Sequence, residues 1–213
     1  VVLLEAERIG WGASGRNGGQ IVSGYSCSMA KVVSLVGQAA ARRFWDLAAE
    51  SIEDVGQRVR RHDIACDLRW GYLFAALNRR QFDDLAEEQR ELADLFGYED
   101  TRLVDHELIQ TLVGTDVYVG GLLDQGGGQL HPLNYLLGLA DAARQAGAVM
   151  FEQSRVTGIE YGPRPVVHTD AGQVRAHYIA LAGNAYLGGL VPPMARRLAP
   201  VVTYIGVTEP LSP

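Results

Sequence analysis

The residues best suited to do chemistry lie at the start of the chain. Val1–Leu4 is an all-apolar run, and Glu5 follows it directly. Such a run is typical of a strand buried on both faces of a parallel sheet, and open α/β sheets bind their ligands at the carboxyl ends of these strands. A carboxylate at that place accepts hydrogen bonds from ribose hydroxyl groups. Glu5 is therefore a candidate ribose-binding residue, and the alternative is a surface glutamate that ends an ordinary strand.

A glycine-rich stretch follows and runs from Gly10 to Gln20. Glycines let a backbone approach a flat or charged ligand closely, and backbone N–H groups near the start of a helix favour a diphosphate. Ser14 and Asn17 can donate hydrogen bonds, and Arg16 can bind a phosphate or carboxylate through two parallel hydrogen bonds. The stretch is interpreted as a cofactor-binding loop, and a glycine-rich surface turn is the alternative.

Gly10, Gly12 and Gly15 match the G-x-G-x-x-G spacing of dinucleotide-binding proteins, but their context argues against that function. The fingerprint directly follows a strand and has an acidic residue about 20 positions later. Here five residues separate the apolar run from Gly10, and no Asp or Glu lies between Arg8 and Trp45. A nicotinamide-dependent enzyme is the weaker alternative. If the first apolar run is the second strand of a nucleotide-binding fold, the fingerprint lies about 20 residues before its glutamate. The sequence is therefore expected to be a piece of a longer protein.

Six stretches together resemble the D-amino-acid oxidase superfamily of FAD-dependent oxidoreductases, in particular its amine oxidases. In chain order they are Glu5–Glu7, Gly12–Gln20, Gly24–Cys27, Leu130–Asn134, Ala182–Leu187 and Thr208–Leu211. The resemblance implies an α/β fold with an incomplete FAD-binding Rossmann-like core and an inserted α+β substrate domain that contains a mixed or antiparallel sheet. It also implies FAD as the cofactor. The implied reaction oxidises an amine to an imine and then an aldehyde, by hydride transfer to flavin N5.

The resemblance also implies which residues contact FAD. Glu5 is expected to bind the ribose, Val156 to lie where the family places a backbone group against adenine, and Ala182 and Gly183 to form a further FAD-contacting turn. The residues expected to line the diphosphate and the isoalloxazine are Ala13, Ser14, Arg16, Asn17, Gly18, Gly19 and Gln20.

The catalytic side chains stay unknown at this stage, with His131 and Tyr25 as candidates. His131 precedes a helix and lies near Gly126–Gly128, which is predicted to be a flexible loop; a local capping role is its alternative. Tyr25 is a candidate to face the flavin, and a core position is its alternative. Desolvation in an apolar pocket lowers the pKa of an amine, so the reaction needs no dedicated base. The remaining histidines lack metal-ligand spacing, so no metal is predicted.

Hydrophobic periodicity and turn signals predict the elements that position these residues. Helices are expected over 18–33, 37–62, 78–97 and 132–146, with a short one after 104. Strands are expected over 1–4, 67–77, 101–104, 117–123, 148–152, 155–161, 165–169, 173–182 and 201–208, with a hairpin turn at Asp170–Gly172 and a buried run at Ala180–Ala182. The FAD-binding domain is assigned to 1–62 and 126–195, a substrate-domain segment to 63–125, and the return to that domain to 196–213.

Composition excludes several classes of protein. The 213 residues are 47% hydrophobic and 21% charged, which is typical of a globular chain. A net charge of −6 argues against binding to nucleic acids or anionic membranes, and no apolar run reaches the ~18 residues of a membrane span. With no visible secretory signal and only two cysteines, a cytoplasmic protein is expected. The expected partner is a small-molecule amine, either polyamine-derived or amino-acid-like. The alternative is a truncated, non-catalytic fragment that does not bind flavin by itself.

Overall fold

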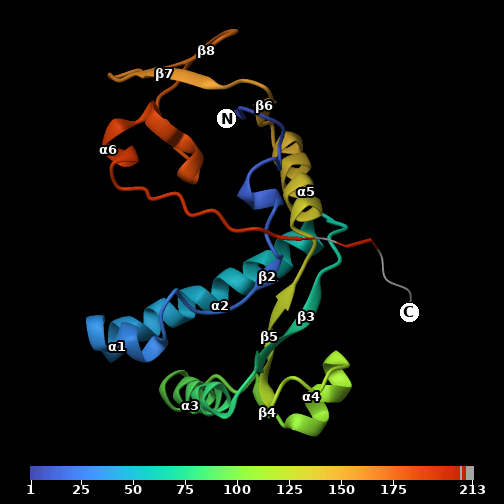
Figure 1. Ribbon diagram of the computed structural model, residues 1–213. Helices are drawn as coiled ribbons and strands as arrows, with labels where there is room; N and C mark the ends of the chain where they lie inside the picture. The colour runs from blue at the N-terminus through green and yellow to red at the C-terminus, as the bar shows by residue number, and fades with distance from the viewer. Residues whose placement is uncertain (207, 210–213) are drawn as a thin grey trace. The chain divides into compact units, whose positions relative to one another are not determined.

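The computed structural model describes residues 1–206, 208 and 209 (Figure 1). The chain divides into two compact units. The first unit consists of Val1–Asn17 together with the residues from Ala140 onward, and the second unit is Gly18–Leu139. The fold is α/β with one parallel strand pair and two antiparallel sheets, which agrees with the predicted fold class. The assignment of FAD-binding and substrate domains to particular ranges stays a prediction.

A parallel pair of strands lies at the start of the first unit. β1 (Val2–Leu4) pairs with β6 (Val149–Phe151), with Val2 opposite Val149. The strand and its parallel direction agree with the sequence, but the predicted burial on both faces is wrong. Val2 and Leu3 are 44% and 42% exposed. Among the described residues β1 has β6 as its one strand partner.

A three-stranded antiparallel sheet completes the strands of the first unit. It consists of β7 (Val156–Glu160), β8 (Val166–Thr169) and β9 (Gly172–Arg175), with β8 in the centre. The predicted hairpin at Asp170–Gly172 is confirmed by the β8–β9 pairing. β9 ends at Arg175, so the buried strand predicted over Ala180–Ala182 is wrong. A strand needs a neighbour that shares its N–H and C=O groups, and no described strand pairs with this run.

Short helical turns fill the rest of the first unit. They are η1 (Ala13–Gly15), η2 (Asn184–Leu190) and α6 (Pro192–Ala195). The strand predicted over 201–208 is wrong for its described residues, 201–206 and 208, none of which is in a strand. Residue 207 and the last part of the Thr208–Leu211 stretch lie outside the described residues.

The second unit is built on an antiparallel sheet around β5 (Gly120–Gln129). β5 pairs with β3 (Arg69–Ala76), β4 (Thr101–Val104) and β2 (Gln20–Ile21). Among the described residues β3 pairs only with β5, so its other edge is open. The strand bulges at Gly71, since the register shifts between Trp70 and Tyr72 and Gly71 has a φ of 102°.

The three glycines at 126–128 are part of β5, so the flexible loop predicted there is wrong. The reason is a buried carboxylate. Asp124 Oδ1 accepts hydrogen bonds from Gly126 N at 3.0 Å and Gly127 N at 3.2 Å, and Gly128 pairs with Trp70. These bonds hold a glycine-rich segment in one conformation that its composition alone would leave free.

The helices of the second unit are α1 (Met29–Val36), α2 (Gln38–Arg61), α3 (Arg79–Phe96), α4 (His106–Val113) and the first part of α5 (Pro132–Gln145). Three of them, α1, α3 and α4, begin at a residue whose side chain caps them. Asn78 caps α3 by accepting from Gln81 N, and Gly97 ends it in the left-handed conformation, which agrees with the helix predicted over 78–97.

The helix predicted over 18–33 is wrong before residue 29. Gln20–Ile21 forms β2, and the Ser28 hydroxyl accepts from Lys31 N to start α1. Gly19 and Gly24 have φ angles of 74° and 100°, which do not occur within a right-handed helix.

The core of the second unit lies where α1, α2 and α3 meet. Trp45 stacks on Phe96 with ring centroids 5.3 Å apart. Both side chains are buried, together with Met29, Ala41 and Leu92. Periodicity alone would put Phe44 and Leu47 on the buried face of α2, but they are 40% and 59% exposed, and the helix instead buries Trp45 on the face that packs in this core.

Candidate functional site

Glu5 lies directly after β1, at the carboxyl end of the strand. Its backbone is fixed by two hydrogen bonds to the chain after β6, one to Phe151 O at 2.9 Å and one from Ser154 N at 2.8 Å. Its carboxylate Oε1 accepts from Glu7 N at 2.9 Å. The carboxylate is thus oriented by its own backbone, and Oε2 can accept from a ribose hydroxyl.

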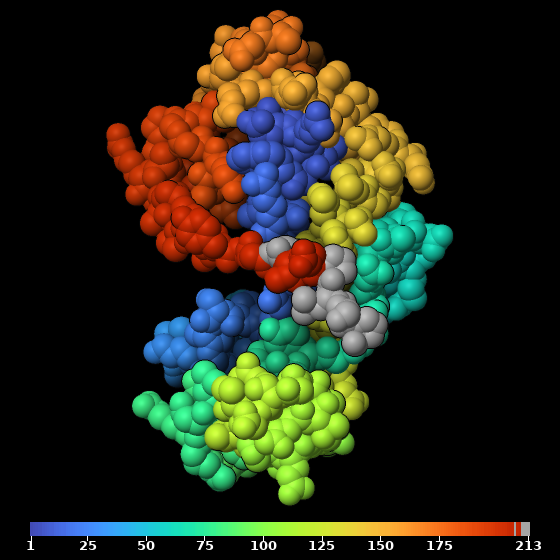
Figure 2. All heavy atoms as spheres, turned by 45° about the vertical axis from the view of Figure 1, so that its right-hand side comes forward, coloured from blue at the N-terminus to red at the C-terminus, as the bar shows by residue number. Residues whose placement is uncertain are grey.

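The segment after Glu5 is joined to the chain that leads into β7. Arg155 pairs with Glu7 at 3.0 Å, and Ile9 N donates to Glu152 Oε1 at 2.8 Å. In Figure 2 the N-terminal segment (blue) lies against the residues near 150 (yellow-orange). Val156, the residue expected to lie at adenine, directly follows Arg155. The first unit therefore brings Glu5 and Val156 into one hydrogen-bonded region.

The glycine-rich loop closes on itself. Arg16 N donates to Ala13 O at 3.1 Å, and the Asn17 side chain donates to Ala13 O at 3.1 Å and Ser14 O at 3.0 Å. A Cβ atom on Gly15 would collide with the carbonyl oxygen of Gly10. Only glycine fits at residue 15 in this backbone, and the closed loop fixes the direction in which Arg16 leaves it.

Trp11 and Tyr186 join this loop, and the sequence reasoning did not assign them a role. The Arg16 guanidinium lies 4.6 Å from the centroid of the Trp11 ring. The edge of Trp11 contacts Tyr186, with centroids 5.8 Å apart and an interplanar angle of 65°. A large aromatic residue among the glycines of a binding loop is the signal that could have singled out Trp11.

Ala182 and Gly183 lie at the start of η2, the turn that carries Tyr186. Gly183 O accepts from Tyr186 N at 2.9 Å. Through Tyr186 the predicted FAD-contacting turn reaches the glycine-rich loop, because a Cβ on Gly12 would lie 3.6 Å from the Tyr186 ring. The candidate residues of the first unit are therefore linked by contacts that the structure shows.

The remaining predicted cofactor residues, Gly18, Gly19 and Gln20, belong to the second unit. Gly19 is buried, has a φ of 74° and accepts from Leu130 N at 2.9 Å. A Cβ on Gly19 would collide with Leu130 O. Gln20 opens β2 opposite Gln129. This glycine lets the chain approach the residue that precedes His131.

His131 has the local capping role that the sequence analysis gave as the alternative to a catalytic one. Its imidazole Nδ1 accepts from Asn134 N at 3.3 Å in the first turn of α5, and its backbone N–H donates to Cys66 O at 2.7 Å. The Cys66 side chain is buried, and this burial raises the pKa of its thiol. The imidazole is exposed and keeps Nε2 for another partner, so a catalytic role for His131 stays a prediction.

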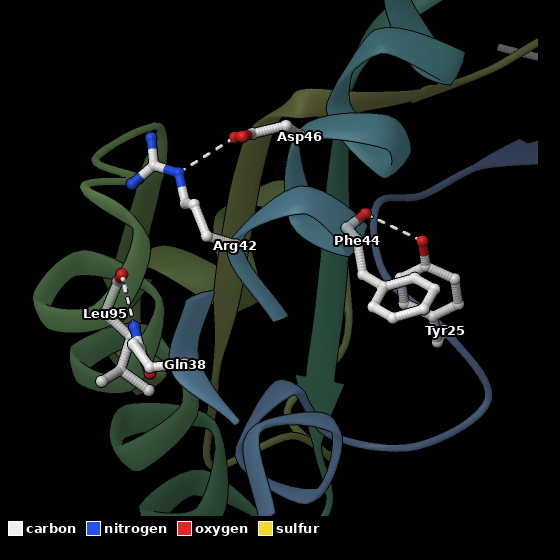
Figure 3. Close-up of polar contacts among 6 residues, drawn as sticks. All are labelled: Tyr25, Gln38, Arg42, Phe44, Asp46 and Leu95. Carbon is white, nitrogen blue, oxygen red and sulfur yellow. Dashed lines mark hydrogen bonds and ion pairs between the residues drawn. The ribbon is translucent and has the colours of Figure 1, made fainter. Parts of the chain in front are cut away.

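Tyr25 packs against the second turn of α2, as Figure 3 shows. Its hydroxyl donates to Phe44 O at 2.8 Å, and its ring meets the Phe44 ring edge-on at 5.7 Å. The side chain is 45% exposed, so it is not a core residue. A catalytic role for Tyr25 stays a prediction, and it would require the hydroxyl to give up this bond.

The second unit also contains a buried carboxylate that the sequence reasoning missed. Asp124 is 4% exposed, and it accepts from the Tyr98 hydroxyl as well as from the two glycine amides. Burial, followed by the bond to Asp124, raises the pKa of Tyr98 well above its ordinary value. The partners of Asp124, Tyr98 and the two glycine amides, are groups of the fold itself, so we assign it to the shaping of β5.

The first unit fits part of an FAD molecule. A carboxylate at the end of a strand suits a ribose, and a guanidinium beside a glycine loop suits a phosphate. Within the described residues, no cluster of three or more His, Cys, Asp or Glu side chains is arranged to hold a metal ion. None of the described helices combines the length and apolar character needed to cross a membrane.

Comparison with known proteins gives consistent results. The model of the DAO family, described as FAD-dependent oxidoreductase, matches residues 1–213. Gamma-glutamylputrescine oxidoreductase of Escherichia coli is 45% identical over 213 residues, which are 100% of this chain and 50% of that protein. A probable oxidoreductase of Haemophilus influenzae, OrdL, is 39% identical over 100% of this chain and 50% of its own length. The chain thus spans about half the length of the curated relatives it matches.

Solved structures show the same fold at lower identity. Glycine oxidase from Geobacillus kaustophilus superposes with a TM-score of 0.68 and 22% identity, over 90% of this chain and 51% of that one. L-amino acid deaminase from Proteus vulgaris gives a TM-score of 0.71 and 19% identity, over 91% and 49%. At this identity the likeness describes the fold alone.

Proposed function

Because this chain belongs to the DAO family of FAD-dependent oxidoreductases, we propose that the protein that carries it oxidises a small-molecule amine. The predicted FAD cofactor is confirmed by the family. The substrate proposal is supported by the 45% identity with gamma-glutamylputrescine oxidoreductase across the whole chain. We propose gamma-glutamylputrescine, or another polyamine-derived or amino-acid-like amine, as the substrate and the cytoplasm as the location.

The proposed reaction converts the amine to an imine, which water hydrolyses to an aldehyde. FAD, when bound, supplies the acceptor for the two electrons, which leave the carbon that bears the amine as a hydride to N5. Glu5 would hold the ribose through its carboxylate, Arg16 would neutralise a phosphate, and the closed glycine loop would let the backbone come close to the cofactor.

The proton of the amine has to leave before the hydride does. An alkylamine has a pKa of about 10, like that of a lysine side chain, so most of it is charged at neutral pH. Desolvation lowers this pKa and makes the neutral amine available. The Tyr25 hydroxyl already donates to Phe44 O, so this side chain would act only after that bond opens. His131 keeps Nε2, which makes it the more available of the two candidates.

The test uses the full-length protein that contains this chain. Purified protein is expected to show a flavin absorbance band between about 300 and 600 nm that stays with it through gel filtration, and to form an aldehyde from gamma-glutamylputrescine. A colourless full-length protein that does not bind added FAD would contradict the proposal.

Glu5→Gln tests the ribose contact within that experiment. Hydrogen bonds to a charged group contribute about 1.5–3 kcal/mol, so the variant is expected to bind FAD about tenfold to a hundredfold more weakly. Glu50→Gln removes an exposed carboxylate from α2 and serves as the matched control, with unchanged affinity. Equal affinities for all three proteins would rule out the assigned role of Glu5.

A further inference from the structure

Arg16 is held against an aromatic ring rather than against a carboxylate. Its guanidinium carbon lies 4.6 Å from the centroid of Trp11. Among the described residues no ion pair involves Arg16; it shares this with several other arginines, and only arginines 42, 58, 60, 79, 144 and 155 pair with acidic side chains. Its positive charge is therefore not neutralised by the fold, and its N–H groups stay available for an anion.

The backbone on both sides of this stack is fixed. Trp11 N donates to Arg8 O at 2.9 Å, and Arg16 N donates to Ala13 O at 3.1 Å. Gly15 lies so close to Gly10 that no Cβ fits between them. The Trp11 and Arg16 side chains thus extend from the two ends of one closed loop, and the fixed backbone of the loop makes them face each other.

The ring is itself supported from a distant part of the chain. The edge of Trp11 meets Tyr186 at 5.8 Å, and Tyr186 also lies over Gly12. Both aromatic side chains remain partly exposed, at 43% for Trp11 and 62% for Tyr186. A planar guanidinium that stacks on a supported ring loses little rotational freedom when it binds a planar or tetrahedral anion.

We propose that Trp11 is a positioning residue that holds the Arg16 guanidinium ready to bind an oxyanion, either phosphate or carboxylate. This proposal rests on the proposed function. The two sources of the oxyanion are the diphosphate of FAD and a carboxylate of an amino-acid-like substrate. Arg16 makes the bond, and Trp11 acts only through Arg16.

A double-mutant cycle tests this dependence in the full-length protein. The variants are Trp11→Ala, Arg16→Ala and the double variant, with Trp11→Phe as the conservative change that keeps a ring. FAD affinity is measured by titration of the apoprotein, and kcat and KM for gamma-glutamylputrescine are measured at saturating FAD. Arg8→Ala removes an exposed arginine from the same segment and is the matched control.

If the diphosphate is the oxyanion, Arg16→Ala weakens FAD binding about tenfold to a hundredfold, as expected for charge-assisted hydrogen bonds. Trp11→Ala weakens it about threefold to tenfold, in line with a cation–π contact. The double variant is no weaker than Arg16→Ala, and Trp11→Phe keeps most of the affinity. If the substrate carboxylate is the oxyanion, the same pattern appears in KM, with FAD affinity and kcat unchanged.

Two results would overturn the inference while wild-type protein still binds FAD. One is unchanged FAD affinity and unchanged KM in both single variants. The other is that Trp11→Ala weakens FAD affinity or raises KM by the same factor in the Arg16→Ala background as in the wild type. Trp11 would then act independently of Arg16. Wild-type protein that binds no FAD would overturn the proposed function first and this inference with it.

Discussion

The glycines of the loop after β1 differ sharply in what they tolerate. We predict that Gly15→Ala destabilises the protein by about 1–3 kcal/mol, the usual effect of overpacking, because the new Cβ collides with Gly10 O. FAD affinity should fall as well, since the loop has to open. Thermal unfolding and FAD titration measure the two effects.

Gly12→Ala is the matched control in the same loop. Gly12 has a φ of −78° and a ψ of −168°, which alanine adopts easily. Its Cβ would lie 3.6 Å from Tyr186, an ordinary contact. We expect unchanged or slightly higher stability, as for other glycines replaced at compatible angles. Equal losses in both variants would show that the loop does not close as described.

Residue types single out candidates for this site, but they do not predict the contacts between them. Glu5 and Arg16 could be singled out because a carboxylate after an apolar strand and a cation among glycines have recognisable chemistry. The meeting of Trp11 with Tyr186 could not be predicted, because the two residues are far apart in sequence and only the tertiary path of the chain brings them together. The same holds for Gly19, where only glycine fits because a Cβ would collide with Leu130 O.

At the scale of elements, β5 depends on the buried carboxylate of Asp124 and its hydrogen bond from the half-buried Tyr98. The pKa of Tyr98 is raised in the fold, whereas an unfolded tyrosine ionises near pH 10. Above about pH 10 the unfolded chain therefore loses a proton that the folded chain keeps, so stability falls as the pH rises. We predict that Tyr98→Phe makes the thermal midpoint less sensitive to pH between about 9 and 11.

The same variant should be less stable below pH 9, by about 1–3 kcal/mol, because Asp124 loses a hydrogen bond. Tyr178→Phe is the control, since Tyr178 is 93% exposed and should change neither stability nor its pH dependence. A pH profile for Tyr98→Phe that runs parallel to that of the wild type would contradict the assignment.

Elements with their own start and stop signals were predicted well. α3 has Asn78 before it and Gly97 after it, and its bounds follow those two residues. The elements that were wrong depend on partners instead. The glycines at 126–128 join β5 because Asp124 and a neighbouring strand hold them, and the run at 180–182 is not a strand because no described strand pairs with it.

For the whole molecule, the predicted FAD contacts fall in both units. Glu5 and residues 13–17 belong to the first unit, and Gly18–Gln20 belong to the second. We predict that FAD slows amide hydrogen exchange at Glu5 and residues 13–17 of the first unit in the full-length protein. With FAD at about 100 times its Kd the slowing can reach about a hundredfold, because binding stabilises the bound state by about 2.7 kcal/mol.

Helix α4 is the internal control for this measurement. In the second unit it packs at the Gly120 end of β5, whereas Gly19 lies beside Leu130, just past the other end. FAD should therefore slow amide hydrogen exchange less in α4 than at the predicted contact residues. Exchange at Glu5 and residues 13–17 that FAD slows no more than exchange in α4 would show that these residues do not touch the cofactor.

The open edge of β3 has a consequence for how the chain behaves in solution. Eight residues, Arg69–Ala76, present one row of backbone N–H and C=O groups that no described strand pairs with. Trp70 and Phe74 on this strand are 45% and 37% exposed. Such an edge is a template for pairing with another copy. The 213 residues handled alone are therefore expected to self-associate with rising concentration, and their colloidal behaviour, rather than their chemistry, would dominate a binding assay.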